Sequence, residues 1–278
     1  MAGKVAVVTG ASRGLGRGVA RALGNAGFKV YVTGRTNADL HAAADEVTDV
    51  GGKGVAVLCD HADDDQVKEL FDQVKADDGR LDILVNNATI VNADTLVAPG
   101  AFWEKSLVLA DTFNVGLRST YVSSYYAAPL MIATGGALIA NISYYGAVSY
   151  HYGAAYGATK AGTDKMSFDM AIDLREHDVA SVSIWPGPLL TEAVKSIPPE
   201  YMTPELALQI ADFESPEFTG LVIERLWQDP ARMKNSGQSL ISAELALRYG
   251  IKDLDGKQPK LYISTLGSPV NRFIDSST

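Results

Sequence analysis

Short apolar runs alternate with longer segments of mixed polarity along most of the chain. The runs lack the polar alternation of a half-exposed strand, which is typical of strands buried on both faces of a parallel sheet. The segments between the early runs repeat apolar residues at helical spacing, so together they predict βαβ units. The apolar runs are Val5–Thr9, Val30–Thr33, Val55–Cys59, Ile83–Asn86, Ala137–Ile142, Val179–Trp185 and Gln238–Ser242, and the early helical segments are Gly14–Ala26, Ala38–Val50 and Asp64–Lys75.

The alternation continues to about residue 245 without a linker, a repeat or a low-complexity segment. It predicts an α/β fold with a doubly wound parallel sheet flanked by helices. We expect a single domain at residues 1–250 and a short C-terminal extension at residues 251–278. Two stretches, Thr89–Asp111 and Pro188–Pro216, are longer than a minimal fold needs. Both follow strand ends, where open α/β sheets bind ligands.

Composition narrows the possible partners and locations. The chain has 278 residues, a formal net charge of −9 and no block of Lys or Arg, which argues against nucleic acid and anionic membranes. Its single cysteine, Cys59, rules out an intrachain disulfide, and the histidines form no spaced cluster with it, so we expect no metal site. No apolar stretch is long enough for a membrane span, so we expect a cytoplasmic protein.

A glycine-rich loop joins the first apolar run to the first helical segment. Its glycines permit a tight turn and a close approach of the backbone to a pyrophosphate. The helix that follows offers unpaired N–H groups and the positive end of its dipole to the phosphates. The alternative is a plain turn, but the place of the loop in a βαβ unit favours a dinucleotide site of Rossmann type. The residues expected to contact the cofactor here are Gly10, Ser12, Arg13, Gly14, Leu15 and Gly16.

The end of the second strand is where such folds select between NAD and NADP. A carboxylate about 20 residues after the loop usually binds the ribose of NAD. Here Gly34 stands in that region and Arg35 follows it, so no acid is available to repel a 2′-phosphate. Arg35 and Arg13 are placed to pair with that phosphate, and the alternative is two solvated arginines. The pattern predicts NADP, or NADPH when reduced, as the cofactor.

A tyrosine and a lysine further along the chain share one helix face, because Tyr156 and Lys160 are spaced i,i+4. A phenol has a reference pKa of about 10, and a neighbouring ammonium lowers that pKa by stabilising the phenolate. Ser143 follows the apolar run Ala137–Ile142, where its hydroxyl is placed to hydrogen-bond a substrate carbonyl. For Ser143 alone, a turn serine at a strand end is the alternative.

These features together resemble the short-chain dehydrogenase/reductases over roughly residues 3–245. Three segments, Ala101–Glu104, Asn114–Arg118 and Arg248–Ile251, also resemble the branch called dehydrogenase/reductase member one. The family motifs are the Thr9–Gly16 loop, Asp60, Asn86-Asn87-Ala88, Asn114, Ser143, the Tyr156/Lys160 pair, and Pro186-Gly187 with Thr191.

The resemblance implies catalytic roles for four of these residues. Tyr156 would be the acid–base, and Ser143 would polarise the substrate carbonyl. Lys160 would lower the pKa of the tyrosine and bind the nicotinamide ribose. Asn114 would hold a water in the proton relay, and the alternative is a side chain at a helix bulge.

The resemblance also implies cofactor contacts beyond the glycine loop and Arg35. Asp60 would accept a hydrogen bond from the adenine amino group, and Thr191 would bind the carboxamide, with a helix N-cap as the alternative for each. Asn87 would steady the sheet beside the cofactor. The cofactor contacts expected in this group are Asp60, His61, Asn87, Tyr156, Lys160, Pro186, Gly187 and Thr191.

Three positions near the expected site stay open. Thr89 replaces the glycine usual in the family, and its side chain would narrow the nicotinamide pocket or redirect the next loop. The tyrosines that crowd the loop before Tyr156 are either pocket walls or packing beneath the loop. His151 either touches substrate or is a packed or solvent-exposed histidine.

These expectations combine into an NADP-dependent oxidoreductase that transfers a hydride between the nicotinamide and a carbonyl or secondary alcohol. The alternatives are an epimerase or dehydratase with bound cofactor, and a dinucleotide-sensing binding protein on the same fold. The segments Ile90–Phe102 and Leu189–Phe213 should flank the nicotinamide, and their apolar side chains predict a small apolar substrate. The uncharged stretch Ser119–Ala128 predicts a homodimer or homotetramer.

Overall fold

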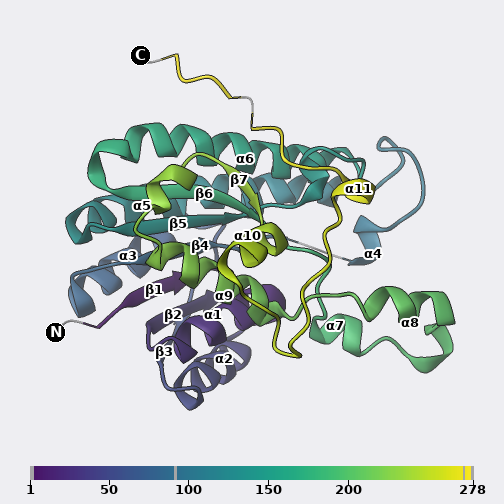
Figure 1. The fold of residues 1–278 in the computed structure, drawn as a ribbon, viewed down its shortest axis with the longest axis horizontal. Coiled ribbons are helices and arrows are strands. Elements are labelled where there is room, and N and C mark those ends of the chain that lie inside the picture. The colour runs from purple at the N-terminus through teal and green to yellow at the C-terminus, as the bar shows by residue number, and fades with distance from the viewer. Residues whose placement is uncertain (1–2, 91–92, 272, 277–278) are drawn as a thin grey trace.

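Parallel strands form one sheet at the centre of the molecule (Figure 1). The structure is a computed structural model that describes residues 3–90, 93–271 and 273–276. In these residues the strand order is β3-β2-β1-β4-β5-β6-β7, and each neighbouring pair is parallel. The predicted doubly wound α/β fold is therefore confirmed. The strands are β1 Val5–Val8, β2 Lys29–Gly34, β3 Lys53–Leu58, β4 Ile83–Asn86, β5 Ala137–Ile142, β6 Val179–Trp185 and β7 Ser239–Ile241.

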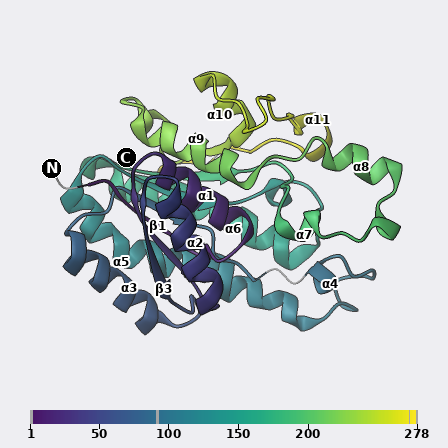
Figure 2. The ribbon, with the colours of Figure 1, turned by 90° about the horizontal axis from the view of Figure 1, so that it is seen from below.

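Helices cover both faces of the sheet. Those labelled α1, α2, α9 and α10 pack on one face, and α3, α5 and α6 pack on the other. In Figure 2, α9 and α10 lie at the top, and α3 and α5 lie at the lower left. The helices are α1 Gly14–Asn25, α2 Asn37–Asp49, α3 Asp64–Asp78, α4 Ala93–Leu96, α5 Ser119–Thr134, α6 Ala154–Leu174, α7 Glu192–Lys195, α8 Pro204–Ile210, α9 Pro216–Gln228, α10 Ser242–Tyr249 and α11 Ile263–Leu266.

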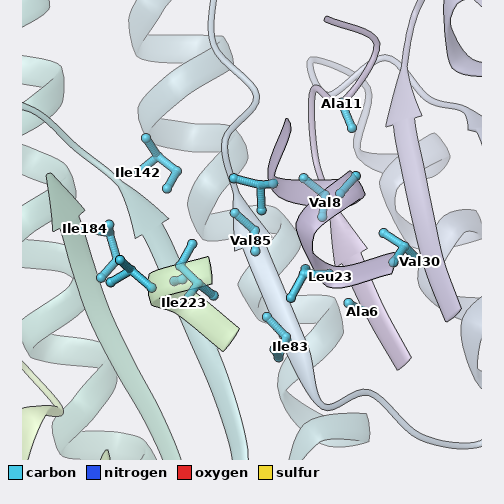
Figure 3. Close-up of a cluster of buried hydrophobic side chains, with 14 of the residues drawn as sticks. Ala6, Val8, Ala11, Leu23, Val30, Ile83, Val85, Ile142, Ile184 and Ile223 are labelled. Carbon is cyan, nitrogen blue, oxygen red and sulfur yellow. The ribbon is translucent and has the colours of Figure 1, made fainter. Parts of the chain in front are cut away.

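The apolar strand runs supply the core, as their lack of alternation predicts. Val8 of β1 and Val85 of β4 lie in the same cluster as Leu23 of α1 and Ile223 of α9 (Figure 3). All four side chains are inaccessible to solvent. Burying one such side chain is worth about 1.5–3 kcal/mol, so this face of the sheet holds α1 and α9 firmly in place. The start of α1 is thereby set against the end of β1.

Element boundaries differ from the predicted ones by a few residues. Helix α3 continues past Lys75 to Asp78, because Gly79 in the left-handed region (φ 64°) is the residue that ends it. The last strand is shorter than predicted, since Ser242 already begins α10. These differences leave the order and type of the elements unchanged.

The two long stretches that follow strand ends both contain short helices. Helix α4 lies in the first, although Val91 and Asn92 of that stretch are outside the described residues, and α7 and α8 lie in the second. All three lie toward the same end of the molecule in both views (Figures 1 and 2). Among the residues that the structure describes, no helix is long and apolar enough to cross a membrane.

The C-terminal extension is attached to the domain at widely separated points. Asp253 accepts a hydrogen bond from the backbone N–H of Ser215 at 2.8 Å, directly before α9. Further along, Asn271 accepts one from the backbone N–H of Ser239 in β7 at 2.9 Å. Arg272, Ser277 and Thr278 of the predicted extension lie outside the described residues. The extension therefore packs against the domain rather than leading away from it.

Candidate active site

Four strand ends bring the predicted site residues to one edge of the sheet. The glycine loop follows β1, Asn87 follows β4, Ser143 follows β5 and Pro186 follows β6. Because all strands are parallel, these carboxyl ends share one edge. The chain order reverses between β1 and β4, which is where open α/β sheets bind ligands.

The shape of the glycine loop is held by hydrogen bonds from the neighbouring strand end. The Asn87 side-chain amide donates to the carbonyls of Thr9 and Gly10 at 2.9 and 3.0 Å. Gly10 lies in the left-handed region (φ 65°), and a Cβ there would approach the Cα of Ala88 to 2.8 Å. Only glycine fits that position, and Asn87 steadies the loop itself as well as the sheet.

The N-terminus of α1 holds an anionic group of the protein itself. The N-cap residue, Arg13, makes no capping hydrogen bond with its side chain, and the first turn contains no acid. The backbone N–H of Gly14 instead donates to a carboxylate oxygen of Glu192 at 3.0 Å. A carboxylate thus stands where a pyrophosphate is expected, which shows that this helix end accepts an anion. The residues of the glycine loop therefore fit the phosphates of a dinucleotide.

The predicted NADP-selecting corner lies beside the same loop. Gly34 ends β2 in a buried position, and a Cβ built on it would lie 3.5 Å from the Ser12 hydroxyl. Arg13 and Arg35 are exposed, and neither forms an ion pair with the described residues. By contrast, the nearby Arg17 is paired with Glu46 at 2.8 Å. Two guanidinium groups are therefore available at this corner for a 2′-phosphate.

The two residues predicted near the adenine have different surroundings. Asp60 accepts a hydrogen bond from the backbone N–H of Ala62 at 3.0 Å. The N-cap of helix α3 is Asp63, so the alternative role of Asp60 as a helix N-cap does not apply. The His61 ring is buried and lies 2.7 Å from the Thr33 hydroxyl. Burial lowers the pKa of His61 to about 4, which keeps the ring neutral. The His61 ring therefore belongs to the core, and the cofactor contact of this residue stays a prediction.

Tyr156 and Lys160 lie in the first two turns of α6. The Lys160 ammonium is buried, donates to the carbonyl of Ile142 at 3.1 Å and lies 5.5 Å from the centre of the Tyr156 ring. Burial lowers the pKa of Lys160 to about 8, and the Asp164 carboxylate opposes that shift. Burial raises the pKa of Tyr156, and Tyr144 raises it further. The expected lowering of the Tyr156 pKa is absent from this structure, because the burial of the phenol outweighs any stabilisation by the ammonium.

Ser143 is turned into the protein. Its side chain is 1% exposed, and its hydroxyl donates to the backbone carbonyl of Lys160 at 3.0 Å. A hydroxyl has one proton to donate. In this structure that proton is directed into the fold, and the donation from Ser143 to a substrate carbonyl stays a prediction.

Among the described residues, no hydrogen bond joins Asn114 to the other catalytic candidates. It is exposed and begins a π-helical turn, Asn114–Arg118, which agrees with the helix-bulge alternative. The kink instead places Gly116 (φ 148°) against the active-site helix, where a Cβ would lie 3.3 Å from the Thr159 side chain. The Thr89 hydroxyl would be 3.1 Å from the same Cβ, so Thr89 packs against this kink. The residue facing α6 is thus a glycine without a side chain.

The loop after β6 reaches from the sheet edge to the glycine loop. Pro186 and Gly187 are buried, and Thr191 precedes α7 without a side-chain cap bond. A Cβ on Gly14 would lie 3.7 Å from the Thr191 methyl group. The loop therefore lies against the glycine loop.

The comparisons with known proteins agree with this geometry. The short chain dehydrogenase family matches residues 4–202. The chain belongs to the short-chain dehydrogenase/reductase family. Dehydrogenase/reductase SDR family member 1 of Mus musculus is 43% identical over 273 residues, covering 95% of this chain and 87% of that protein. The Homo sapiens protein of the same name is 42% identical with the same coverage, so the predicted family and branch are confirmed.

Solved structures of the short-chain dehydrogenase/reductase family share the fold. A double mutant of a Serratia marcescens short-chain dehydrogenase/reductase superposes with a TM-score of 0.73 at 29% identity, covering 86% of this chain and 96% of that one. An actinorhodin polyketide ketoreductase mutant with NADPH has a TM-score of 0.74 at 23% identity and covers 86% and 95% of the two chains. The second likeness shows the fold alone.

Two buried carboxyl groups in this short-chain dehydrogenase/reductase were missed by sequence reasoning. Asp164, 6% exposed and one turn after Lys160, accepts from the Ser183 hydroxyl at 2.6 Å and the Trp185 indole at 3.0 Å. Glu214, 1% exposed, accepts from the backbone N–H of Gly187 at 2.9 Å. The i,i+4 spacing from Lys160 was an available signal for Asp164. No pattern in the sequence around Glu214 indicated its role, because its hydrogen-bond partner Gly187 lies in another element.

An aromatic cluster surrounds the tyrosine of this short-chain dehydrogenase/reductase. The rings of Tyr144, His151 and Tyr152 lie 6.5, 6.4 and 5.2 Å from the Tyr156 ring, measured between centres. Tyr145 is instead fully buried beneath them, and Tyr150 is 87% exposed. Both interpretations of the tyrosine cluster thus apply: Tyr144 and Tyr152 line the site, while Tyr145 is packing.

Proposed function

We propose that this family member is an NADP(H)-dependent oxidoreductase acting on a carbonyl or secondary alcohol, with residues 1–250 as the dinucleotide-binding and catalytic domain. The observation that carries the proposal is the placement of Tyr156 and Lys160. Both lie at the start of α6, and the Lys160 ammonium is bonded to the end of β5 at Ile142. This puts an acid–base pair at the sheet edge that also holds the glycine loop.

The protein residues would handle the proton and the orientation of the reactants. A bound nicotinamide supplies the hydride to the carbonyl carbon, or accepts it in the reverse direction. The Tyr156 hydroxyl gives its proton to the carbonyl oxygen as charge develops there. With its pKa at about 8, Lys160 carries a charge at neutral pH, and that charge favours the phenolate that Tyr156 leaves behind. Lys160 would also bind the nicotinamide ribose.

Four sets of residues would hold the cofactor. The glycine loop and the α1 N-terminus suit the pyrophosphate, since the carboxylate of Glu192 already occupies that helix end. Arg13 and Arg35 would bind the 2′-phosphate and select NADP(H). Asp60 would receive the adenine, while Pro186, Gly187 and Thr191 would hold the nicotinamide.

The substrate proposed is a small apolar carbonyl compound or alcohol. The Tyr144 and Tyr152 rings beside Tyr156 offer it an apolar surface. A relative, 7alpha-hydroxysteroid dehydrogenase of Escherichia coli (strain K12), is 31% identical over 206 residues and covers 73% of this chain and 76% of that protein. Its name supports an apolar alcohol as the kind of substrate. We further propose a cytoplasmic homodimer or homotetramer.

Turnover of added cofactor tests the proposal against its alternatives. A panel of aldehydes and ketones is mixed with the protein and NADPH, and absorbance follows the oxidation of NADPH. The proposal expects net consumption of NADPH in step with alcohol formation. An epimerase or dehydratase with bound cofactor would convert its substrate without net consumption. A dinucleotide sensor would bind NADPH and turn over nothing, and either outcome would reject the proposed function.

A further inference from the structure

The group that polarises the substrate carbonyl is the open question in this site. The surroundings of Ser143 argue against this residue. Its hydroxyl donates to the Lys160 carbonyl at 3.0 Å. The Asp164 carboxylate is a second acceptor, and a hydrogen bond from Ser143 lowers the pKa of Asp164, which burial raises. Either acceptor lies inside the fold, and the side chain is 1% exposed. A substrate oxygen would have to displace a buried hydrogen bond to use this serine.

The next residue faces the other way. The Tyr144 backbone is extended (φ −170°, ψ 166°), and successive side chains of an extended chain point to opposite sides. Because Ser143 points into the protein interior, Tyr144 points to the opposite side. Its side chain is half-buried and so remains within reach of a ligand.

Tyr144 also lies beside the acid–base residue. Its ring is 6.5 Å from the Tyr156 ring, at an interplanar angle of 70°. A charge on Tyr144 would raise the pKa of Tyr156, which places the two phenols within electrostatic reach of each other. The two phenol rings are therefore neighbours at the same site.

Neighbouring rings hold the Tyr144 phenol in this orientation. Tyr145 contacts it edge to face at 5.3 Å, and Tyr145 is in turn fixed by Trp185 at the same distance. His151 contacts the Tyr144 ring from another side at 5.1 Å. A side chain held by such contacts loses little further freedom when it binds substrate.

We propose that Tyr144 is a catalytic residue that donates the hydrogen bond to the substrate carbonyl, while Ser143 braces α6 against the end of β5. The inference rests on the proposed function. As the hydride bonds to the carbonyl carbon, the C=O π electrons move to the oxygen, and the O–H bond of Tyr156 breaks to protonate it. Tyr144 keeps its own proton throughout. Burial raises the pKa of Tyr144, which suits a donor that does not ionise.

The test compares three variants that each remove one hydroxyl. Tyr144→Phe keeps the ring and its edge contacts, Ser143→Ala removes the buried serine hydroxyl, and Tyr145→Phe is the matched control on the adjacent buried ring. NADPH binding by fluorescence and the melting temperature establish that each variant is folded. We expect kcat/KM for acetophenone and benzaldehyde to fall by about 100-fold or more in Tyr144→Phe, the loss typical of removing one oxyanion donor. We expect Ser143→Ala and Tyr145→Phe to stay within about fivefold, with Ser143→Ala lowering the melting temperature.

The outcomes separate this inference from the proposed function. A loss of about 100-fold in Ser143→Ala overturns the inference whether or not Tyr144→Phe also loses activity, and so does an unaltered Tyr144→Phe. The C=O stretching frequency of enzyme-bound acetophenone is a second measurement. It should be lowered in the wild type and in Ser143→Ala but not in Tyr144→Phe, and the reverse pattern overturns the inference. Full activity of Tyr156→Phe would instead reject the proposed mechanism as a whole.

Discussion

Glu192 and Gly14 lie 178 positions apart in the chain, yet a carboxylate oxygen of Glu192 accepts a hydrogen bond from the Gly14 backbone N–H at 3.0 Å. The loop after β6 thereby places a negative charge at the N-terminus of α1. That is the position where the pyrophosphate of a dinucleotide is expected. Glu192 must leave this helix end, or share it, when the cofactor binds.

Glu192→Gln should therefore tighten NADPH binding. A charge at an exposed helix end is worth about 0.3–1 kcal/mol, so the dissociation constant should fall by about twofold to fivefold at low salt. Calorimetric titration measures this change. Glu200→Gln, an exposed acid in the same stretch, is the control and should leave binding unaltered. Weaker binding in Glu192→Gln would show that Glu192 supports the cofactor rather than competes with it.

Tyr156→Phe should leave NADPH binding nearly intact and lower kcat by at least about 100-fold. The variant removes the proton donor and keeps the ring, and general acid–base groups contribute about 10²–10⁴-fold. Lys160→Ala should weaken cofactor binding as well, because the ammonium is expected to bind the ribose. Steady-state kinetics with a fluorescence titration distinguish the two effects. Near-normal turnover in Tyr156→Phe would contradict the mechanism.

The unmodified protein should prefer NADPH over NADH by at least about tenfold in kcat/KM. Charge-assisted hydrogen bonds are worth about 1.5–3 kcal/mol, and even after discounting for exposure about 1.4 kcal/mol remains. Gly34→Asp with Arg35→Ala should reverse the order. An added Cβ at Gly34 meets ordinary contacts at 3.5 Å, so the backbone there accepts a Cβ. Raising the salt concentration should weaken the preference, and equal use of both cofactors at low salt would refute the assignment.

The pH dependence of turnover should report Lys160. Burial places its pKa at about 8, so the ammonium is present below that pH and is lost as the pH rises through it. The rate of turnover should accordingly fall as the pH rises above about 8. Asp164→Asn removes the carboxylate that raises the Lys160 pKa, so in this variant the fall in turnover should begin at a lower pH.

A second pair on the same helix is the matched control for this shift. Lys165 and Asp169 have the same i,i+4 spacing, but both side chains are about half exposed, at 51% and 55%. Asp169→Asn should leave the pH dependence of turnover unchanged, because solvent screens the exposed pair. Equal pH profiles for Asp164→Asn and the wild type would show that Asp164 has no influence on Lys160.

The outer face of α5 should form a subunit interface. Tyr121 and Tyr125 are 54% and 63% exposed there, in a helix without charged residues. Light scattering should give a mass of at least twice the 29.6 kDa of one chain. Tyr125→Glu should reduce that mass by placing a charge in the interface, whereas Tyr150→Glu, on another exposed tyrosine, should not. A wild-type species of only one chain mass at micromolar concentration would disprove the interface.

Local patterns in the sequence were sufficient for the fold and for the placement of Tyr156 and Lys160 on one helix face. Strands β4, β5 and β6 have the predicted bounds, because apolar runs buried on both faces are legible without tertiary contacts. Tyr156 and Lys160 share a helix face because that relation depends only on the helical repeat. The same logic made the glycine loop predictable, since its turn and the helix after it are neighbours in the chain.

Tertiary structure alone decided where the polar side chains of the site point. The side chains of Ser143, Glu214 and Glu192 form hydrogen bonds with the backbone of Lys160, Gly187 and Gly14, respectively. Each bond joins elements that meet only after folding. The direction of a polar side chain at a strand end depends on which neighbour offers a hydrogen-bond partner. A buried polar group without such a partner costs free energy, so the available partner fixes the direction. Spacing along the chain does not contain that information, so the sequence placed Ser143 at the right strand end but did not reveal that its hydroxyl bonds to the Lys160 carbonyl.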